Sequence, residues 1–363
     1  MALALDSKTS IHKIDRSGML DLVAGFPRQC EEAVQIGQKA AIGTAYGPFK
    51  AIVLAGMGGS AVAGDLLRCY LSRTIDVPIM TVRDYGFPRA VGQGTLVFCS
   101  SYSGDTEETL TLYEEARRRR ARVLCITTGG KLAEQCGRDG VPWIRIPEGM
   151  PPRSALGYLF LPILVTLWRL GVAPPRWSEL DDVAERLGEA NRRCAVEVPA
   201  AENVAKQLAR QLRNKLVVVH ASNEHLEAAA ARWKAQMAEN AKVLAFHSLY
   251  PEMNHNEICG WAGHKTLASA SHVITLRDSE DHPRVQRRME ISTELIGRGG
   301  AGVSQVWSGS GTPLARMLSL IHLGDFVSVY LAILRRVDPT PVVAIGTIKD
   351  RLVEDDDKEA ARG

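Results

Sequence analysis

IVLAGMGGSAVAGDLL, the stretch from Ile52 to Leu67, decides the fold that the sequence predicts. An apolar run ends at Gly56, two more glycines and Ser60 follow, and an Ala- and Leu-rich segment then has the composition of a helix. This order predicts a strand, a tight loop and a helix. Such a loop turns unpaired backbone N–H groups outward at a helix N-terminus, where the helix dipole also attracts an anion. The expected ligand of the loop is a phosphate group.

The same loop leaves two other interpretations open. It lacks the Gly-Lys-Ser/Thr sequence of a nucleoside triphosphate loop, but Ala61 could complete a dinucleotide-binding fingerprint. A glycine-rich turn can also serve only to let a strand and a helix pack closely. The loop alone does not decide between these interpretations.

A second loop carries an unusual density of hydroxyl groups. After the apolar run Leu96–Cys99, the sequence SSYSGDTEET occupies residues 100–109 and opens another predicted helix. Hydroxyls beside a glycine suit the oxygens of a phosphate monoester, because each hydroxyl can rotate to donate a hydrogen bond. The alternative is an ordinary helix cap, with Ser103 or Thr106 as the capping residue and a capping-box acid behind it.

The two loops together resemble the sugar isomerase (SIS) domain, a doubly wound module that binds phosphosugars. Two later segments narrow the resemblance to the bifunctional phosphoglucose/phosphomannose isomerases. These segments are ARWKAQMAENAK, from Ala231 to Lys242, and MNHNEICGW, from Met253 to Trp261. The resemblance covers nearly the whole chain after its N-terminal segment.

Apolar runs that alternate with helical segments indicate parallel sheets covered by helices on both faces. We therefore predict an α/β protein of two doubly wound, three-layer αβα SIS subdomains joined by helices. The expected parts are an N-terminal helical segment (1–44), a first SIS domain (45–172), linking helices (173–210) and a second SIS domain with C-terminal helices (211–363). In the second unit Ala221-Ser222-Asn223 replaces the glycine-rich loop, so phosphate binding is not expected there.

Two segments predict simple local structure. Residues Ile11 to Ala41 have apolar positions at helical spacing and predict one N-terminal helix. Residues Gly297 to Gly311 are glycine-rich and predict a loop.

Composition restricts the class of protein. A chain of 363 residues is long enough for two domains, and a net charge of +3 favours neither nucleic acid nor a membrane as the main partner. We identify no apolar span of 18 residues and no signal-peptide pattern, and therefore expect a cytoplasmic protein. Seven scattered cysteines without a Cys-x-x-Cys pair indicate reduced thiols.

The resemblance implies four catalytic residues. Isomerisation needs a group that moves a proton between neighbouring carbons, and a partly buried carboxylate suits this task. By resemblance Glu239 is this base, and His255 opens the sugar ring from the partner subunit of a homodimer. Arg153, in a Pro-Arg-x-x-x-Gly segment, would stabilise the enediolate, and Lys349 would lie over the sugar. Each of the four could instead be an ordinary surface or loop residue.

The phosphate is expected on both loops. The residues expected to bind it are Gly58, Gly59, Ser60, Ser101, Ser103 and Thr106. Asp105 departs from the asparagine often found in the family, and its charge would disfavour a phosphate dianion unless the carboxylate points away.

Neither a metal nor another cofactor is expected. His255, Cys259 and His264 could be imagined as zinc ligands, but the sequence has neither a His-Glu-x-x-His helix nor a paired-cysteine knuckle. An enediol route needs no metal.

The resulting prediction is an isomerase that interconverts fructose 6-phosphate with glucose 6-phosphate and, by family, mannose 6-phosphate. The main alternative is a non-catalytic phosphosugar sensor of the kind attached to DNA-binding regulators. No basic, helix-turn-helix-like segment precedes residue 45, which counts against the sensor. An isomerase acting on amino sugars is a third possibility.

Overall fold

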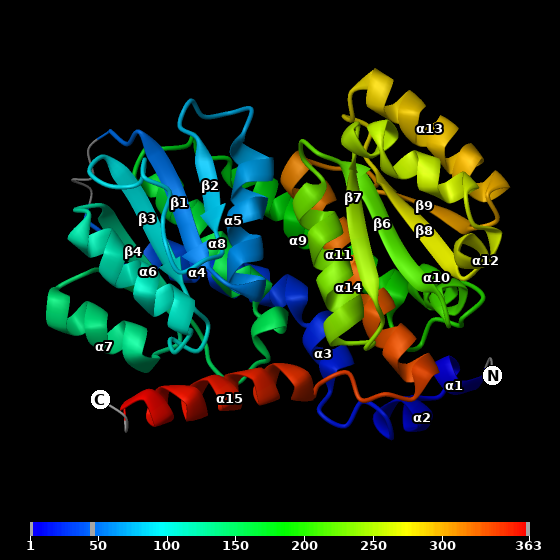
Figure 1. Ribbon diagram of the computed structural model, residues 1–363, viewed down its shortest axis with the longest axis horizontal. Helices are drawn as coiled ribbons and strands as arrows, with labels where there is room; N and C mark the ends of the chain where they lie inside the picture. The colour runs from blue at the N-terminus through cyan, green and yellow to red at the C-terminus, as the bar shows by residue number, and fades with distance from the viewer. Residues whose placement is uncertain (1–2, 44–47, 361–363) are drawn as a thin grey trace.

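Two parallel sheets form the two halves of the protein, and they lie on opposite sides of a central group of helices (Figure 1). The computed structural model describes residues 3–43 and 48–360. The first sheet has the order β2-β1-β3-β4-β5 and the second has the order β7-β6-β8-β9. Every strand pair is parallel. The predicted α/β class with two doubly wound sheets is confirmed.

The strands are short, and the interior strands of each sheet are almost entirely buried. Those of the first sheet are β1 (Ala51–Gly56), β2 (Ile79–Val82), β3 (Thr95–Ser100), β4 (Arg122–Thr127) and β5 (Trp143–Arg145). Those of the second sheet are β6 (Leu216–Ser222), β7 (Ala245–Tyr250), β8 (Ser271–Arg277) and β9 (Gly302–Trp307). In each sheet the chain reverses its direction of travel across the sheet once, between β1 and β3 or between β6 and β8. Doubly wound sheets bind ligands at this switch point, beyond the carboxyl ends of the strands.

Alternating side chains of the first sheet enter two different cores. Ile52 and Leu54 belong to a buried cluster with α5 (Gly58–Leu71) and α8 (Leu156–Arg169). Val53 and Ala55 belong to a second cluster with α6 (Glu107–Arg118) and α7 (Gly130–Asp139). Because the side chains of a strand alternate between its faces, this division produces the three layers.

The second sheet is covered in the same way. Val217 and Val219 share a cluster with α10 (Val204–Leu212), α11 (Glu227–Glu239) and α14 (Pro313–Arg335), and Val218 packs with Met289 of α13 (Pro283–Arg298). The outer face also carries η2 (Glu252–His255), η3 (Glu257–Ala262) and α12 (Lys265–Ser269).

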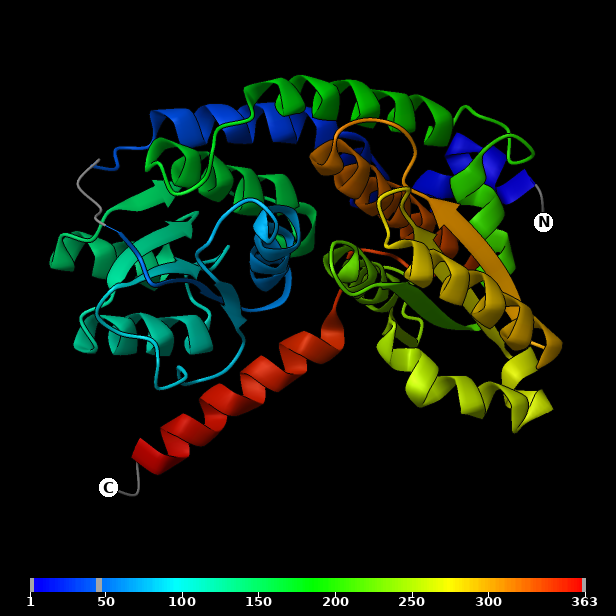
Figure 2. The same cartoon turned by 90° about the horizontal axis from the view of Figure 1, so that it is seen from above.

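The two halves share one continuous core. Leu54 of the first sheet and Val219 of the second belong to a single buried cluster. α9 (Trp177–Cys194) packs against both α14 and α4 (Phe26–Lys39), and Figure 2 shows α4 and α9 side by side. At the contact between α11 and α14, a Cβ on Gly324 would lie 2.4 Å from the Trp233 ring. Only glycine allows this close approach, which fixes α11 against α14.

The single N-terminal helix predicted for residues 11–41 is wrong. The described chain instead has α1 (Leu3–Asp6), α2 (Lys8–His12), α3 (Met19–Ala24) and α4. The break has a local cause: the Asp15 carboxylate accepts hydrogen bonds from the backbone N–H groups of Met19 and Leu20, each at 2.8 Å. Gly18 has a left-handed φ of 69°, which a continuous helix cannot contain.

The glycine-rich segment 297–311 is not only a loop, because it contains β9. This strand pairs with β8 along its whole length, and a Cβ on Gly302 would lie 2.4 Å from Nδ1 of His272. At Gly302, therefore, glycine permits a close approach between neighbouring strands and does not mark a loop. Strand β7 is not predicted from the sequence either, because its exposed Phe246 and half-buried neighbours obscure the strand pattern.

The prediction that no apolar span reaches 18 residues is also wrong. α14 is long and apolar enough to cross a membrane by length and composition, with a mean hydropathy of 1.8. However, 83% of the 18-residue stretch of α14 with this hydropathy is buried within the protein, as expected for the core helix of a globular fold. At the other extreme, α15 (Val343–Ala360) stands clear of both sheets (Figure 2).

Candidate active site

The glycine-rich loop is tightly fitted between its neighbours. α5 begins at Gly58, which has a φ of 50°, directly after the end of β1. A Cβ on Gly56 would lie 2.7 Å from the carbonyl oxygen of Ser100, because β1 and β3 pair with Gly56 opposite Ser100. The two predicted phosphate loops therefore leave the sheet side by side, at the first switch point.

The hydroxyl-rich loop is organised around Ser101. Its Oγ lies 2.8 Å from Oγ1 of Thr106 and accepts the backbone N–H of Gly104 at 3.0 Å. Ser103 Oγ accepts the backbone N–H of Asp105 at 3.2 Å. Gly104 has a φ of 80°, and a Cβ there would lie 1.9 Å from the carbonyl oxygen of Gly129. The loop is thus held compact by its own hydroxyl groups and by its close approach to Gly129.

The Asp105 carboxylate is engaged at the start of α7. Its Oδ1 accepts the backbone N–H of Lys131 at 3.0 Å, in the first turn of α7. A carboxylate in this position is stabilised by the N-terminal end of the helix dipole. The helix therefore fixes the direction of this side chain.

Arg153 connects the phosphate loops to the second half of the protein. It lies in η1 (Pro152–Ser154), and a Cβ on Gly59 would lie 3.6 Å from the Arg153 Cα. Its side chain is 5% exposed. Nε donates to Oδ1 of Asn240 at 2.6 Å, and Nη2 donates to the carbonyl oxygens of Pro339 and Thr340, each at 2.8 Å. The guanidinium is therefore fixed by segments from the far end of the chain.

Glu239 ends α11 beside this guanidinium. Its Oε2 lies 3.7 Å from Nη1 of Arg153, and its side chain is 28% exposed. Lys242 Nζ donates to the carbonyl oxygens of Glu239 at 2.5 Å and Pro339 at 3.1 Å. Burial and the nearby Arg153 charge lower the pKa of Lys242. A carboxylate that solvent can reach thus lies beside the buried Arg153 guanidinium, and Lys242 is held nearby by two backbone carbonyl oxygens.

A buried polar network supports Arg153 from behind. Arg232 donates through Nη2 to the carbonyl oxygen of Arg153 at 2.9 Å and pairs with Asp325 of α14 at 2.7 Å. Gln236 Nε2 also donates to Asp325, at 3.0 Å. Burial raises the pKa of Asp325 although Arg232 opposes this effect. The network orients the Arg153 backbone because a buried ion pair is costly unless its geometry is maintained.

Sequence reasoning gave these supporting residues no role. Lys242, Arg232, Gln236 and Asn240 all lie in the segment that matched the family, whereas Asp325 lies in the strongly apolar α14. The available signal was a set of polar side chains on the buried face of α11. A charged residue within a buried helix, such as Asp325 in α14, likewise indicates a buried polar partner.

Two predicted site residues lie elsewhere in this chain. His255 is exposed in η2, after β7, whereas Glu239 precedes β7. The six residues of β7 span roughly 20 Å, so the two side chains lie toward opposite ends of the second sheet. Lys349 is exposed on the projecting α15 (Figure 2). One chain therefore brings together the two loops, Arg153 and Glu239, but neither His255 nor Lys349.

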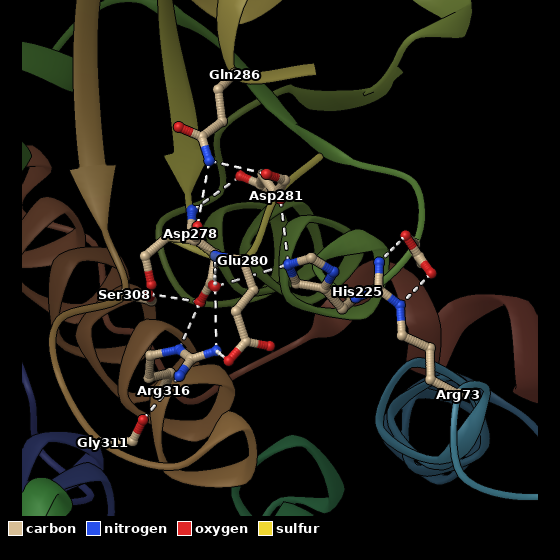
Figure 3. Close-up of polar contacts among 11 residues, drawn as sticks. Arg73, His225, Asp278, Glu280, Asp281, Gln286, Ser308, Gly311 and Arg316 are labelled. Carbon is tan, nitrogen blue, oxygen red and sulfur yellow. Dashed lines mark hydrogen bonds and ion pairs between the residues drawn. The ribbon is translucent and has the colours of Figure 1, made fainter. Parts of the chain in front are cut away.

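The switch point of the second sheet has a different chemistry (Figure 3). Asp278 pairs with Arg316 at 2.9 Å and accepts a hydrogen bond from the Ser308 hydroxyl at 2.6 Å. Nearby, His225 Nε2 lies 3.2 Å from Oδ1 of Asp281. Burial lowers the pKa of His225, but Asp281 and Asp278 outweigh it, so the net change is upward. Burial raises the pKa of Asp278, but hydrogen bonds and the Arg316 charge outweigh it and hold the pKa below its ordinary value.

A cavity of about 300 Å³ borders this cluster, and its lining includes the ion pair between Glu224 and Arg73, which lies in the turn after α5. Each cation of the cluster already has a carboxylate partner from the chain itself. The second switch point thus contains an internal ion cluster in the place where the first has glycines and hydroxyls.

Two doubly wound units, one of which carries glycine and hydroxyl loops at its switch point, define a tandem sugar isomerase (SIS) protein. Residues 49–170 match the family model of the SIS domain, and residues 201–352 match that of the bacterial phospho-glucose isomerase C-terminal SIS domain. The chain belongs to the bifunctional phosphoglucose/phosphomannose isomerase family.

Two relatives with that name carry the assignment. The protein from Caldicellulosiruptor bescii is 40% identical over 336 residues, which cover 93% of this chain and 99% of the relative. The protein from Aquifex aeolicus is 37% identical over 84% of this chain and 91% of its own length.

Solved structures support the fold alone. A hypothetical protein from Thermus thermophilus superposes with a TM-score of 0.67 at 18% identity, covering 94% of each chain. A glucose-6-phosphate isomerase like protein from the same organism has a TM-score of 0.58 at 20% identity, covering 93% of this chain and 97% of its own.

Proposed function

We propose that this protein is an aldose–ketose isomerase that interconverts glucose 6-phosphate and mannose 6-phosphate with fructose 6-phosphate. The observation that carries the proposal is the position of Arg153. Its backbone adjoins the glycine-rich loop at Gly59, and its guanidinium lies 3.7 Å from the Glu239 carboxylate. A phosphate anchor and a carboxylate base are thereby linked through one buried cation. The names of the relatives specify the same pair of activities.

The phosphate would be held by the two loops of the first switch point. The proposed contacts are backbone N–H groups of the glycine-rich loop and side-chain hydroxyl groups. They come from Gly58, Gly59, Ser60, Ser101, Ser103 and Thr106. Hydroxyls and a helix N-terminus can bind a dianion without adding charge of their own, and the Asp105 carboxylate is engaged at α7. The domain division proposed from the sequence, 45–172 and 211–363, assigns this phosphate site to the first SIS domain.

Glu239 would act as the base. In the aldose it takes the proton from C2, the C2–H electron pair forms the C1=C2 double bond, and the carbonyl π pair moves to O1. Arg153 stabilises the resulting enediolate charge, because its position is fixed before the reaction. Delivery of the proton to C1, with transfer of a proton from O2 to O1, forms the C2 carbonyl of the ketose. Loss of configuration at C2 in the enediolate explains why both epimers can react.

A second subunit would complete the site. His255 would reach the reacting sugar of the partner subunit in a homodimer and move the ring-oxygen proton during opening. Lys349 would approach the sugar from α15, whose apolar residues Ile345, Ile348 and Leu352 are exposed. The proposed enzyme uses neither a metal nor another cofactor, acts in the cytoplasm, and binds neither nucleic acid nor a membrane.

The variant Glu239→Gln tests the proposed base. It retains the size of the side chain but cannot accept the proton, so kcat should fall by about 1000-fold for both epimers, within the range of general base catalysis. Binding of fructose 6-phosphate, measured by calorimetry, should remain within roughly threefold, because the phosphate loops are intact. The exposed residue Glu294, on α13, provides a matched control as Glu294→Gln.

The same assays distinguish the other functions. Unchanged turnover in Glu239→Gln would reject Glu239 as the base. A wild-type protein that binds fructose 6-phosphate without turnover would be a phosphosugar sensor. Activity confined to glucosamine 6-phosphate would indicate an isomerase of amino sugars.

A further inference from the structure

An acidic side chain, Glu257, ties the loop that carries His255 to a central strand of the second sheet. Oε1 of Glu257 lies 2.9 Å from Nε2 of His220 and accepts the Trp261 Nε1–H at 3.0 Å. His220 is fully buried on β6, the strand next to β7. We name these three residues the Glu257 anchor. It joins the exposed η2 and η3 to a central strand.

The charge of Glu257 is well defined. Burial raises the pKa of Glu257, but hydrogen bonds and the neighbouring His220 outweigh this effect and bring it to about 2. Glu257 is therefore ionised at neutral pH and can only accept hydrogen bonds. Nε2 of His220 must then carry a proton and donate it. Charge-assisted hydrogen bonds of this kind are stronger than neutral ones.

The rest of the loop reinforces the same arrangement. Met253 is 2% exposed and packs in the small outer core, and Asn254 Nδ2 donates to Ser292 Oγ of α13 at 2.7 Å. The His255 side chain between these attachments is exposed and makes no hydrogen bond to the part of the chain that the structure describes. The loop is thus fixed on both sides of a histidine that projects outward.

We infer that Glu257 is a positioning residue for the reaction, acting through His255. This inference rests on the proposed function, in which His255 opens the sugar ring in the partner subunit. A histidine that must reach a second subunit needs a rigid support, because an error of about 1 Å in the placement of a catalytic group can cost 100-fold in rate. Glu257 supplies this support by tying the loop to β6 through His220.

The test compares Glu257→Ala, which removes the acceptor, with Glu257→Gln, whose amide oxygen can still accept from His220 and Trp261. Glu257→Ala should lower kcat roughly 10- to 100-fold, with a smaller change in KM, because the phosphate loops lie on the other sheet. Glu257→Gln should restore most of the activity. Glu290→Gln, which changes an exposed acid of α13, is the matched control and should be neutral.

A double-mutant cycle with His255→Ala shows whether Glu257 acts through the histidine. His255→Ala alone should lower kcat by about 100-fold. In the His255→Ala background, Glu257→Ala should then lower kcat little further, because the group that Glu257 positions is already absent. Additive losses, or failure of Glu257→Gln to restore activity, would overturn the inference. Full activity of His255→Ala would instead overturn the proposed role of His255.

A loss of folding must be separated from a loss of positioning. Binding of sorbitol 6-phosphate, an unreactive hexitol phosphate, measured by calorimetry, should be unchanged in each variant. If Glu257→Ala does not fold, Trp261→Phe removes one donor from the anchor while retaining an aromatic ring. It should reduce kcat several-fold in the wild-type background and have no further effect beside His255→Ala. A reduction of equal size in both backgrounds would contradict the inference.

Discussion

The first and second sheets have the same switch-point geometry but opposite chemistry. Between β1 and β3 the crevice contains glycines and the hydroxyl groups of Ser101 and Thr106. Between β6 and β8 it contains Asp278 and Asp281, with Arg316 and His225 as their counter-ions. A doubly wound sheet therefore supplies the location of a binding site, whereas the side chains in the two loops decide whether an anion can enter.

Two similar sheets in one chain can therefore serve different purposes. An anion approaching the second crevice would meet carboxylates, and every cation of the cluster already has a partner (Figure 3). The second unit instead contributes Glu239 and the buried network around Arg232, which support the first crevice from outside. In the proposed function the first unit binds the phosphate and the second supplies the base and its support, and four predictions test this division.

The largest effect is expected when a carboxylate, as found in the second crevice, is introduced into the first. Ser101→Asp would place a carboxylate beside a phosphate dianion, and a like charge about 4 Å away costs about 4 kcal/mol per unit charge at an effective dielectric constant near 20. Binding of fructose 6-phosphate should weaken by at least about 1000-fold in calorimetry. Ser101→Asn has the same shape without the charge and should bind far better. Equal losses in the two variants would show that size, not charge, is decisive.

Breaking the ion cluster should destabilise the protein. Asp278→Ala leaves the buried Arg316 without its main partner, which costs about 3 kcal/mol of unfolding free energy. We expect the lower end of the usual range, because Arg316 keeps its bonds to Glu280 and the Gly311 carbonyl. Urea unfolding measures the change. Glu280→Gln, at a half-exposed partner, should cost less than about 1 kcal/mol, and an equal cost would contradict this ranking.

The His225 pair should make stability depend on pH. Because its pKa is raised in the folded state, protonation stabilises the fold below the unfolded pKa, and this contribution is lost as the pH rises through the higher folded value. The difference in unfolding free energy between wild type and His225→Gln should be about 1 kcal/mol at acidic pH. It should shrink above pH 6.5. A difference that grew with pH would refute the assigned charge.

The smallest effect is expected at Asp105. Asp105→Asn removes a charge from the N-terminus of α7, and such a charge contributes about 0.5 kcal/mol. The amide oxygen can still accept the Lys131 N–H, so unfolding free energy should fall only by this amount. Because the carboxylate is engaged at α7, affinity for fructose 6-phosphate should change by less than about threefold. A tenfold gain would show that the carboxylate faces the phosphate.

Local signals carried most of the fold prediction. Composition located β1 and β3, because buried parallel strands form apolar runs that can be recognised without knowledge of their neighbours. It missed β7 and misassigned β9, which lie at the edges of the second sheet, where Phe246 and Trp307 are exposed. The Asp15 cap was also missed, so the N-terminal helices were merged into one.

The candidate site was only partly accessible in the same way. The phosphate loops could be identified from their own residues, and the resemblance selected Arg153 and Glu239. Neither source indicated Asp325, because a charged residue in α14 acquires its partner only when α14 packs against α11. Nor could they show that Asp105 is directed toward α7.

The sequence by itself determined the α/β class, the glycine turn at Gly56–Gly59 and the hydroxyl loop, because backbone sterics and hydroxyl chemistry act between near neighbours in the chain. Only the tertiary structure decided the contact of Arg153 with Asn240 and Thr340, which lie 87 and 187 residues away. Contacts of this kind depend on how helices pack around a shared core. No local pattern of residues specifies such packing in advance.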